Sequence, residues 1–292
     1  MSSTPLKPPV LVGVDGSEAA LAAVRWAAVD AAQHGAPLHI VYGIGAPIDF
    51  GPGIAFDQID YESFRTAGSA AVAAARETAI AAATPIHPIE VETFVVDATP
   101  IPVLRDRSKD ARLLVVGTHG FGALRRGLLG SVSTSLARHA HCPVAVIPQP
   151  AEGGTDRTNG PVVVGVDGSP GGALALDVAF DEATRRRAAL VAVLTWSEFN
   201  RYIPRAEMQN DAEELLAESI AGYAEKYPDV RIQRVVVEGS PAKHILATAD
   251  HAQLIVVGSH GHGGFAGMTL GSVSQAVMHA AECPVIIARP HD

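Results

Sequence analysis

Residues 113–120 read Leu-Leu-Val-Val-Gly-Thr-His-Gly and are followed, after nine further residues, by Gly-Ser-Val-Ser at 130–133. The pattern returns at 254–261 as Leu-Ile-Val-Val-Gly-Ser-His-Gly, again followed after nine residues by Gly-Ser-Val-Ser, at 271–274. Each copy has the pattern of a buried strand, a glycine loop and the start of a helix. Glycines let backbone N–H groups close around an anion, and a helix N-terminus adds free N–H groups and a positive dipole end. The repeat therefore predicts two phosphate sites, and a structural turn with Gly at a left-handed cap is the alternative.

The size and composition of the chain indicate two globular domains. Its 292 residues exceed what one core usually supports, and they are 48% hydrophobic and 18% charged. A net charge of −9 argues against a nucleic-acid or anionic-membrane surface as the main function. No apolar run reaches membrane-spanning length, and residues 1–9 lack the apolar segment of a signal peptide. The two cysteines, Cys142 and Cys283, make a disulfide framework improbable, so we expect a cytoplasmic protein with no nucleic-acid or membrane partner.

A second repeated motif shows that a whole domain is duplicated. Val-Leu-Val-Gly-Val-Asp-Gly-Ser at 10–17 matches Val-Val-Val-Gly-Val-Asp-Gly-Ser at 162–169, an offset of 152, whereas the glycine loops are offset by 141. We expect domains at 1–149 and 161–292, joined by a flexible linker at 150–160. The 11 extra residues of the first copy fall mostly in Gly45–Asp60, which we interpret as a flap near the first site or, alternatively, a tolerated surface insertion.

Strand and helix patterns alternate through both copies. In the first copy we expect strands at 10–14, 38–42, 90–96, 112–116 and 143–147, and helices that follow Ser17, span 62–83, begin at Thr99-Pro100 and span 131–140. In the second we expect strands at 162–166, 189–194, 230–237, 253–257 and 284–288, and helices at 170–187, 208–226, from Ser240-Pro241, and at 272–281. Such alternation predicts a mostly parallel α/β sheet with helices on both faces, which binds ligands beyond the carboxyl ends of its strands.

Candidate binding residues gather at those carboxyl ends. Asp15 and Asp167 follow the first strand of each copy, where a carboxylate accepts a ribose hydroxyl or holds a phosphate-bound Mg²⁺ through water; turn and cap roles are the alternative. A Gly-Lys pair occurs nowhere, so the chain has no P-loop. Residues 261–266 fit the loose dinucleotide pattern only by chance, because they do not follow the first strand of their domain.

The nine-residue spacers differ between the copies. Arg125 and Arg126 in the first spacer could reach phosphates, or form a solvated pair, whereas the second spacer has no Lys or Arg, so we predict unequal sites. His119, His260 and His262 either donate to phosphate or are merely exposed. We interpret His139 and His141 as histidines at a helix C-terminus and not as metal ligands, and the cysteines as buried small residues.

These motifs, taken together, resemble the ATP-binding branch of the universal stress proteins over nearly the whole chain. The resemblance implies a five-stranded parallel α/β sheet per domain, of the adenine nucleotide alpha hydrolase-like type, with ATP, accompanied by Mg²⁺, at the strand ends. It places the first strand and second strand near adenine and ribose and the glycine loop around ribose and phosphates. We therefore assign to the first site Gly13, Asp15, Val41, Gly117, Thr118, His119, Gly120, Phe121, Gly122, Arg126, Gly130, Ser131, Val132 and Ser133. To the second we assign Gly165, Asp167, Val193, Gly258, Ser259, His260, Gly261, His262, Gly263, Gly271, Ser272, Val273 and Ser274.

The functional hypothesis is a cytoplasmic stress-response protein that binds one ATP per domain with at most weak ATPase activity. The resemblance also implies that domains pair through their last strands, at Val144–Ile147 and Val285–Ile287, with a homodimer and an unidentified signalling partner. No catalytic base, nucleophile or metal cluster has recognisable spacing. The alternatives are a slow ATPase or a nucleotidyl- or phosphoryl-transfer enzyme on the same fold, and an interaction scaffold in which the nucleotide is structural.

Overall fold

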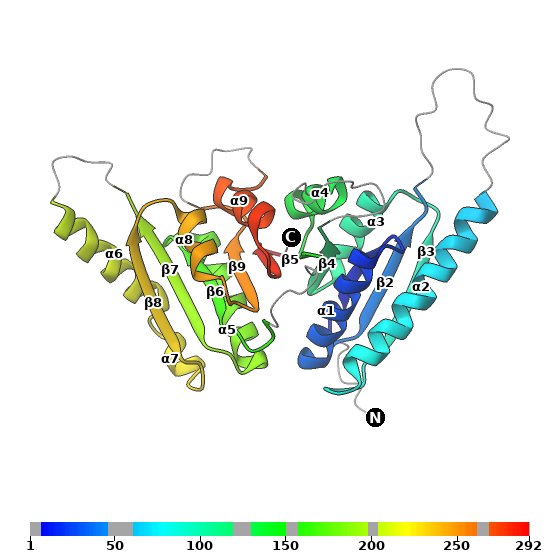
Figure 1. The fold of residues 1–292 in the computed structure, drawn as a ribbon, viewed down its shortest axis with the longest axis horizontal. Helices are drawn as coiled ribbons and strands as arrows, with labels where there is room; N and C mark the ends of the chain where they lie inside the picture. The colour runs from blue at the N-terminus through cyan, green and yellow to red at the C-terminus, as the bar shows by residue number, and fades with distance from the viewer. Residues whose placement is uncertain are drawn as a thin grey trace, which may run out of the picture. The chain divides into compact units, whose positions relative to one another are not determined.

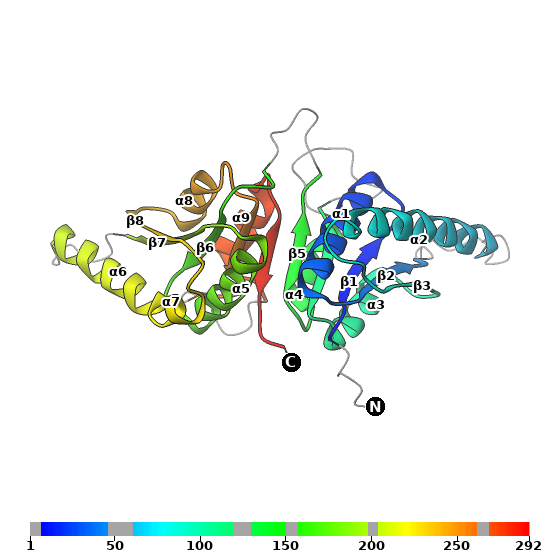
Figure 2. The ribbon, with the colours of Figure 1, turned by 90° about the horizontal axis from the view of Figure 1, so that it is seen from below.

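The computed structural model describes residues 7–45, 61–118, 130–149, 157–197, 204–261 and 269–291. The chain divides into two compact units, Met1–Cys142 and Pro143–His291; most of their elements are labelled in Figure 1, and Figure 2 shows them from below. In the described part of the chain, no helix has both the length and the apolar character needed to cross a membrane.

The first unit is a parallel sheet in the order β3-β2-β1-β4 with connecting helices. Strand β1 lies at the centre and pairs with β2 on one side, where Gly13 lies opposite Val41, and with β4 on the other, where Val10 lies opposite Leu113. Its elements are β1 (Val10–Val14), α1 (Glu18–His34), β2 (Leu38–Gly43), α2 (Tyr61–Ala83), β3 (Val91–Val96), α3 (Pro100–Arg107), a 3₁₀ turn (Ser108–Asp110), β4 (Leu113–Gly117) and α4 (Ser131–His139).

The second unit repeats this order and holds the last strand of the first copy. Strands β8-β7-β6-β9-β10 are parallel, and β5 pairs with β10 in the antiparallel direction, with Val285 opposite Val146 and Ile287 opposite Val144. The pairing expected between the two last strands is therefore present. The elements are β5 (Val144–Ile147), β6 (Val162–Val166), α5 (Pro170–Arg186), β7 (Leu190–Trp196), α6 (Arg205–Ile220), α7 (Tyr223–Lys226), β8 (Ile232–Glu238), α8 (Pro241–Thr248), β9 (Leu254–Gly258), α9 (Ser272–Ala280) and β10 (Val285–Ala288).

The first helix of each unit begins at a serine that caps it, as its sequence predicts. Ser17 Oγ accepts a hydrogen bond from the Ala20 N–H at 3.2 Å, and Ser169 Oγ accepts one from the Gly172 N–H at 3.0 Å. Helix α1 stops at Gly35, whose φ of 59° lies in the left-handed region that glycine adopts without steric cost. Central strands β1, β4, β6 and β9 bury nearly every residue, as continuous apolar runs in a sheet covered on both faces should.

Three expectations from the sequence need correction. The single helix expected at 208–226 starts earlier, at Arg205, and is interrupted at Gly222. The φ of Gly222 is 82°, which does not occur in a regular α-helix, so α6 and α7 are separate helices. Strand β7 runs to Trp196, two residues beyond the range expected. Thr99 precedes α3 but makes no side-chain capping bond. The proposed flap lies almost entirely outside the described residues, because only Gly45 of it is described.

Residues that lead from the linker into β6 are fixed to the second unit. Arg157 pairs with Glu282 at 2.8 Å, and the Gln253 side chain donates to the Gly160 carbonyl at 2.6 Å. A Cβ at residue 160 would lie 1.9 Å from the His251 carbonyl oxygen, so only glycine fits there.

Candidate functional site

The carboxyl edge of the second sheet brings the two repeated motifs together. Asp167 follows β6, and Gly258 ends the neighbouring strand β9. A Cβ built on Gly261 would lie 2.2 Å from Asp167 Oδ2, so the carboxylate lies directly against the glycine loop. In the first unit, Asp15 follows β1, and Gly117 ends the neighbouring strand β4, at the corresponding edge.

Each Asp-Gly-Ser turn is fixed by its own aspartate. One carboxylate oxygen of Asp15 accepts from the Ser17 N–H at 3.0 Å and from its hydroxyl at 2.6 Å, and Asp167 makes the same two bonds to Ser169 at the same distances. Gly16 and Gly168 have φ values of 87° and 77°. The turn role considered from the sequence is therefore present, and in the second unit the other carboxylate oxygen faces the loop.

The first glycine of each loop lets the loop approach the first turn of a helix. A Cβ on Gly258 would lie 2.7 Å from the Gly171 carbonyl oxygen, and one on Gly117 would lie 3.1 Å from that of Ala19. Gly171 itself has no room for a side chain, because its Cβ would lie 2.2 Å from the His260 carbonyl oxygen. The second loop therefore sits closer to its helix than an alanine at 171 would permit.

The residues expected near adenine lie at matched positions inside each sheet. Gly13 is paired with Val41 and Gly165 with Val193. Both valines are only 1% exposed. The two glycines have a packing reason as well, because a Cβ would meet Leu104 Cδ1 at 2.6 Å on Gly13 and Ile245 Cδ1 at 2.7 Å on Gly165. Helices α3 and α8 thus cross the first strands where these lack side chains.

The helix that follows each glycine loop has an uncapped N-terminus. Gly130 precedes α4 and Gly271 precedes α9, and neither helix has a side-chain capping bond. The two N-cap glycines instead donate their own N–H groups back to the loop, to the carbonyls of Thr118 and Ser259, each at 2.7 Å. Helices α1 and α5 are capped by serines, whereas α4 and α9, like α3, α6 and α8, have no side-chain capping bond. Of these uncapped helices, α4 and α9 are the two that directly follow the glycine loops, and N–H groups of such a first turn suit an external anion.

The serines of the two Gly-Ser-Val-Ser segments divide into two kinds. Ser131 and Ser272 are exposed at the first helical position. The other pair is buried and bonds the chain itself, since Ser133 Oγ donates to the Gly130 carbonyl at 3.0 Å and Ser274 Oγ to the Gly258 carbonyl at 2.5 Å. The hydroxyls of the buried pair therefore hold loop to helix.

Several candidate residues fall outside the described part of the chain. They are His119, Gly120, Phe121, Gly122, Arg125, Arg126, His262 and Gly263. Among those described, His260 Nδ1 lies 3.2 Å from Ser259 Oγ. His139 lies in the last turn of α4, as expected for a helix C-terminus, and both cysteines are buried.

One wall of the second site was not found from the sequence. Leu215 of α6 lies over Gly168, where its Cδ1 would be 2.9 Å from an added Cβ, although the leucine is 38% exposed. At the end of β7, Trp196 Nε1 donates to Gln209 Oε1 of α6 at 2.6 Å. The spacing of apolar residues in α6 does not indicate which residue Leu215 contacts. The sequence therefore gave no signal for its place beside Gly168.

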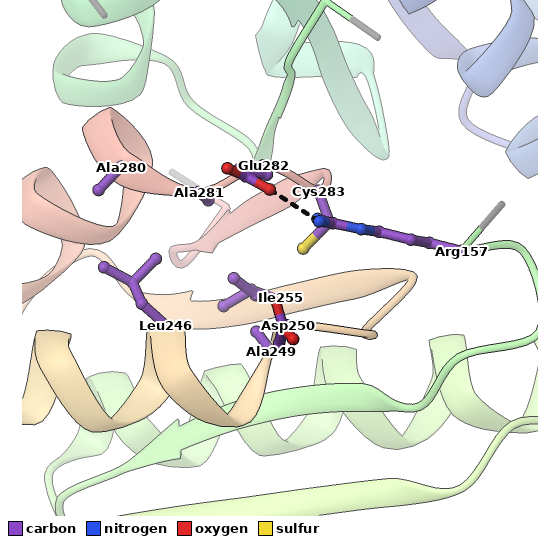
Figure 3. A pocket seen from close by; sticks show the side chains of 9 residues that line it. All are labelled: Arg157, Leu246, Ala249, Asp250, Ile255, Ala280, Ala281, Glu282 and Cys283. Atoms are coloured by element: carbon purple, nitrogen blue, oxygen red, sulfur yellow. Dashed lines mark hydrogen bonds and ion pairs between the residues drawn. The ribbon is translucent and has the colours of Figure 1, made fainter. Parts of the chain in front are cut away.

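A cavity of about 70 Å³ lies at the opposite end of β9 and β10 (Figure 3). Its floor is apolar, and Arg157, Glu282 and Asp250 lie around it together with the Cys283 thiol. Burial raises the pKa of Cys283 to about 11, so the group is a protonated thiol at neutral pH. This cavity lies at the amino ends of the strands and takes no part in the glycine-loop site.

The fold and the candidate site define a class: duplicated, mostly parallel α/β proteins with a glycine loop at the carboxyl edge of each copy. The model of the universal stress protein family matches the chain twice, at residues 8–148 and 158–289, and the chain belongs to this family. A universal stress protein of Mycobacterium tuberculosis is 45% identical over 284 residues, which cover 96% of each chain. Another from the same species is 42% identical over 290 residues, again covering 96% of each.

A solved structure supports the fold. The crystal structure of a universal stress protein from Archaeoglobus fulgidus covers 97% of this chain and 97% of its own, with a TM-score of 0.72 at 21% identity. The two proteins therefore share the fold over both copies of the repeat.

Proposed function

We propose that this universal stress protein binds one ATP in each copy, with little or no turnover, and acts in stress signalling through its nucleotide state. The observation that carries the proposal is the contrast between helix N-termini. The serine-capped helices α1 and α5 have a side chain where an anion would bind, whereas α4 and α9 begin at glycines without a side-chain cap. Backbone N–H groups at such a terminus suit phosphate.

A nucleotide, and not a bare phosphate, is supported by what surrounds the loop. Asp167 lies against Gly261, so a ligand whose phosphates follow the loop would bring a hydroxylated sugar near this carboxylate. Carboxylates accept hydrogen bonds from sugar hydroxyls. Leu215, which is 38% exposed and lies over Gly168, supplies apolar surface beside this carboxylate.

Magnesium fits the charge of this ligand. A triphosphate carries several negative charges, and residues 262–270 contain no Lys or Arg. In the second copy, neutralisation would therefore depend on N–H groups, hydroxyls and a divalent cation held by phosphate oxygens and waters. In the first copy Arg125 and Arg126 add positive charge, so we propose tighter binding there.

Low turnover is supported by the use of the polar groups. The Asp15 and Asp167 carboxylates each accept two bonds from the serine of their own turn. The buried serine hydroxyls donate to loop carbonyls. The aspartates thus fix their own turns and the serines fix the loop, whereas hydrolysis requires a group that positions and deprotonates an attacking water.

The test is the amount of nucleotide that purified protein carries. The protein is incubated with Mg-ATP, desalted and denatured, and the released nucleotide is quantified per chain. ATP near two per chain supports two sites, and about one per chain supports unequal sites. Released ADP that accumulates with time would favour the slow ATPase, and no nucleotide would leave the scaffold as the better hypothesis.

A further inference from the structure

An ion pair recurs at the same place in both units. In the first, Arg65 near the start of α2 pairs with Asp97, the residue directly after β3. In the second, Arg205 at the start of α6 pairs with Glu238, the last residue of β8. The two acids are 141 residues apart, the same offset as the glycine loops, and the two arginines are 140 apart.

The helices that carry the arginines otherwise differ. Helix α2 has 23 residues and is rich in alanine, whereas α6 has 16 residues and is rich in glutamate. The connections from the second strand also differ in length, since 17 residues separate β2 from α2 and eight separate β7 from α6. An ion pair that recurs although its helix and connection have changed points to a shared role.

Main-chain bonds join the ends of the second and third strands beside each ion pair. The Ile44 N–H donates to the Val96 carbonyl at 2.8 Å, next to Asp97. The Gly239 N–H donates to the Trp196 carbonyl at 2.8 Å, next to Glu238. The arginines thus attach the helix starts to strand ends that are already joined, at the carboxyl edge of each sheet.

Helix α6 connects this attachment to the candidate site. Arg205 lies ten residues before Leu215, about 15 Å along a helix, and Leu215 contacts Gly168 beside Asp167. The Trp196–Gln209 bond adds a second attachment one turn after Arg205. In the first unit, Gly68, one turn after Arg65, packs on the Tyr42 ring, which would lie 2.8 Å from an added Cβ.

We propose that Arg205–Glu238 and Arg65–Asp97 are positioning pairs that hold the outer wall of each nucleotide site. The inference rests on the proposed function, because the wall matters only if a nucleotide binds beside it. Neither pair contacts the ligand in this account. Arg205–Glu238 fixes the start of the helix whose Leu215 packs on the Asp167 turn, and Arg65–Asp97 has the corresponding place between α2 and the end of β3.

The experiment uses the full chain and charge reversal. Arg205→Glu, Glu238→Arg and the double swap are compared with Arg185→Glu, which makes the same charge change at the exposed Arg185–Asp181 pair of α5. All are made with Trp26→Phe, which leaves Trp196 as the single tryptophan and a fluorescence reporter of the second site. Hydrogen exchange of residues 205–215 is measured first, without nucleotide, and Mg-ATP is then titrated.

We expect faster exchange at the start of α6 in both single reversals and recovery in the double swap. In the single reversals, ATP affinity at the second site should fall about two- to fivefold, because exposed ion pairs contribute free energies of this size. The double swap should restore the affinity. Arg185→Glu should change neither. Single reversals that behave like Arg185→Glu, or a double swap without recovery, would overturn the proposal. If the protein without charge reversals binds no ATP, the proposed function fails. The hydrogen-exchange data then still decide whether the Arg205–Glu238 pair holds the start of α6.

Discussion

Asp167 and Gly261 lie 94 residues apart in the sequence and in direct contact in the fold, since a Cβ on Gly261 would come within 2.2 Å of Asp167 Oδ2. The contact joins the turn after β6 to the loop after β9. Any side chain at residue 261 must therefore move either the carboxylate or the loop.

Gly261→Ala should remove ATP from the second site and leave the first occupied, because the added methyl group displaces the carboxylate that lines the loop. ATP released on denaturation should fall from about two per chain to about one. Gly45→Ala is the control, since its Cβ meets only Pro100 Cδ at an ordinary 3.5 Å. Full stoichiometry in Gly261→Ala would contradict the placement of the site.

Ser272→Glu should raise the stability of the free protein and weaken its ATP binding. A carboxylate in the first turn of a helix interacts favourably with the dipole, by about 0.3–1 kcal/mol, and would repel phosphate at the same place. Thermal unfolding with and without Mg-ATP measures both effects. Ser131→Glu is the matched change on α4. A gain in stability without any loss of ATP affinity would mean that the terminus binds no anion.

Gly171→Ala should destabilise the second unit, although alanine is the better helix former. The new methyl group would lie 2.2 Å from the His260 carbonyl oxygen, and overpacking of this kind costs about 1–3 kcal/mol. Urea unfolding measures the change. The first copy has Ala19 at this position, so Ala19→Gly is the reciprocal variant and should cost only the helix propensity, about 1 kcal/mol. A stabilising Gly171→Ala would show that the loop does not approach the helix this closely.

The stability of the first unit should depend on the charge of His39. Burial is the largest cause that lowers its pKa below 6.5; Arg107 acts in the same direction, and Glu92 and Glu90 oppose it. Because the unfolded chain then binds the proton more readily, stability should rise with pH between the lowered pKa and 6.5.

The check on His39 is urea unfolding over about pH 5 to 8, the range in which histidine titrates. His39→Val, which introduces the residue found at the matching position 191, should flatten the dependence in this window. An unchanged pH profile in that variant would assign the dependence to other groups.

The sequence was sufficient for the alternation of strands and helices and for the strand ends at which Asp167 and the Gly258 loop lie, because both follow from repeated local patterns. Asp167 and the Gly258 loop were expected at one edge, and the fold brings them into contact. The position of Leu215 was not predictable, because it depends on how α6 lies against the turn at Gly168. The break at Gly222 was missed because a single glycine within a helical pattern is often tolerated.

The antiparallel β5–β10 pair determines how the chain can be divided. Val285, Ile286 and Ile287 are buried, and their strand has β9 on one side and β5 on the other. A fragment cut within the linker, from Arg157 onward, would lack β5 and present an unprotected apolar strand edge to solvent. Proteolysis between the copies would therefore yield a second half that self-associates or aggregates through β10.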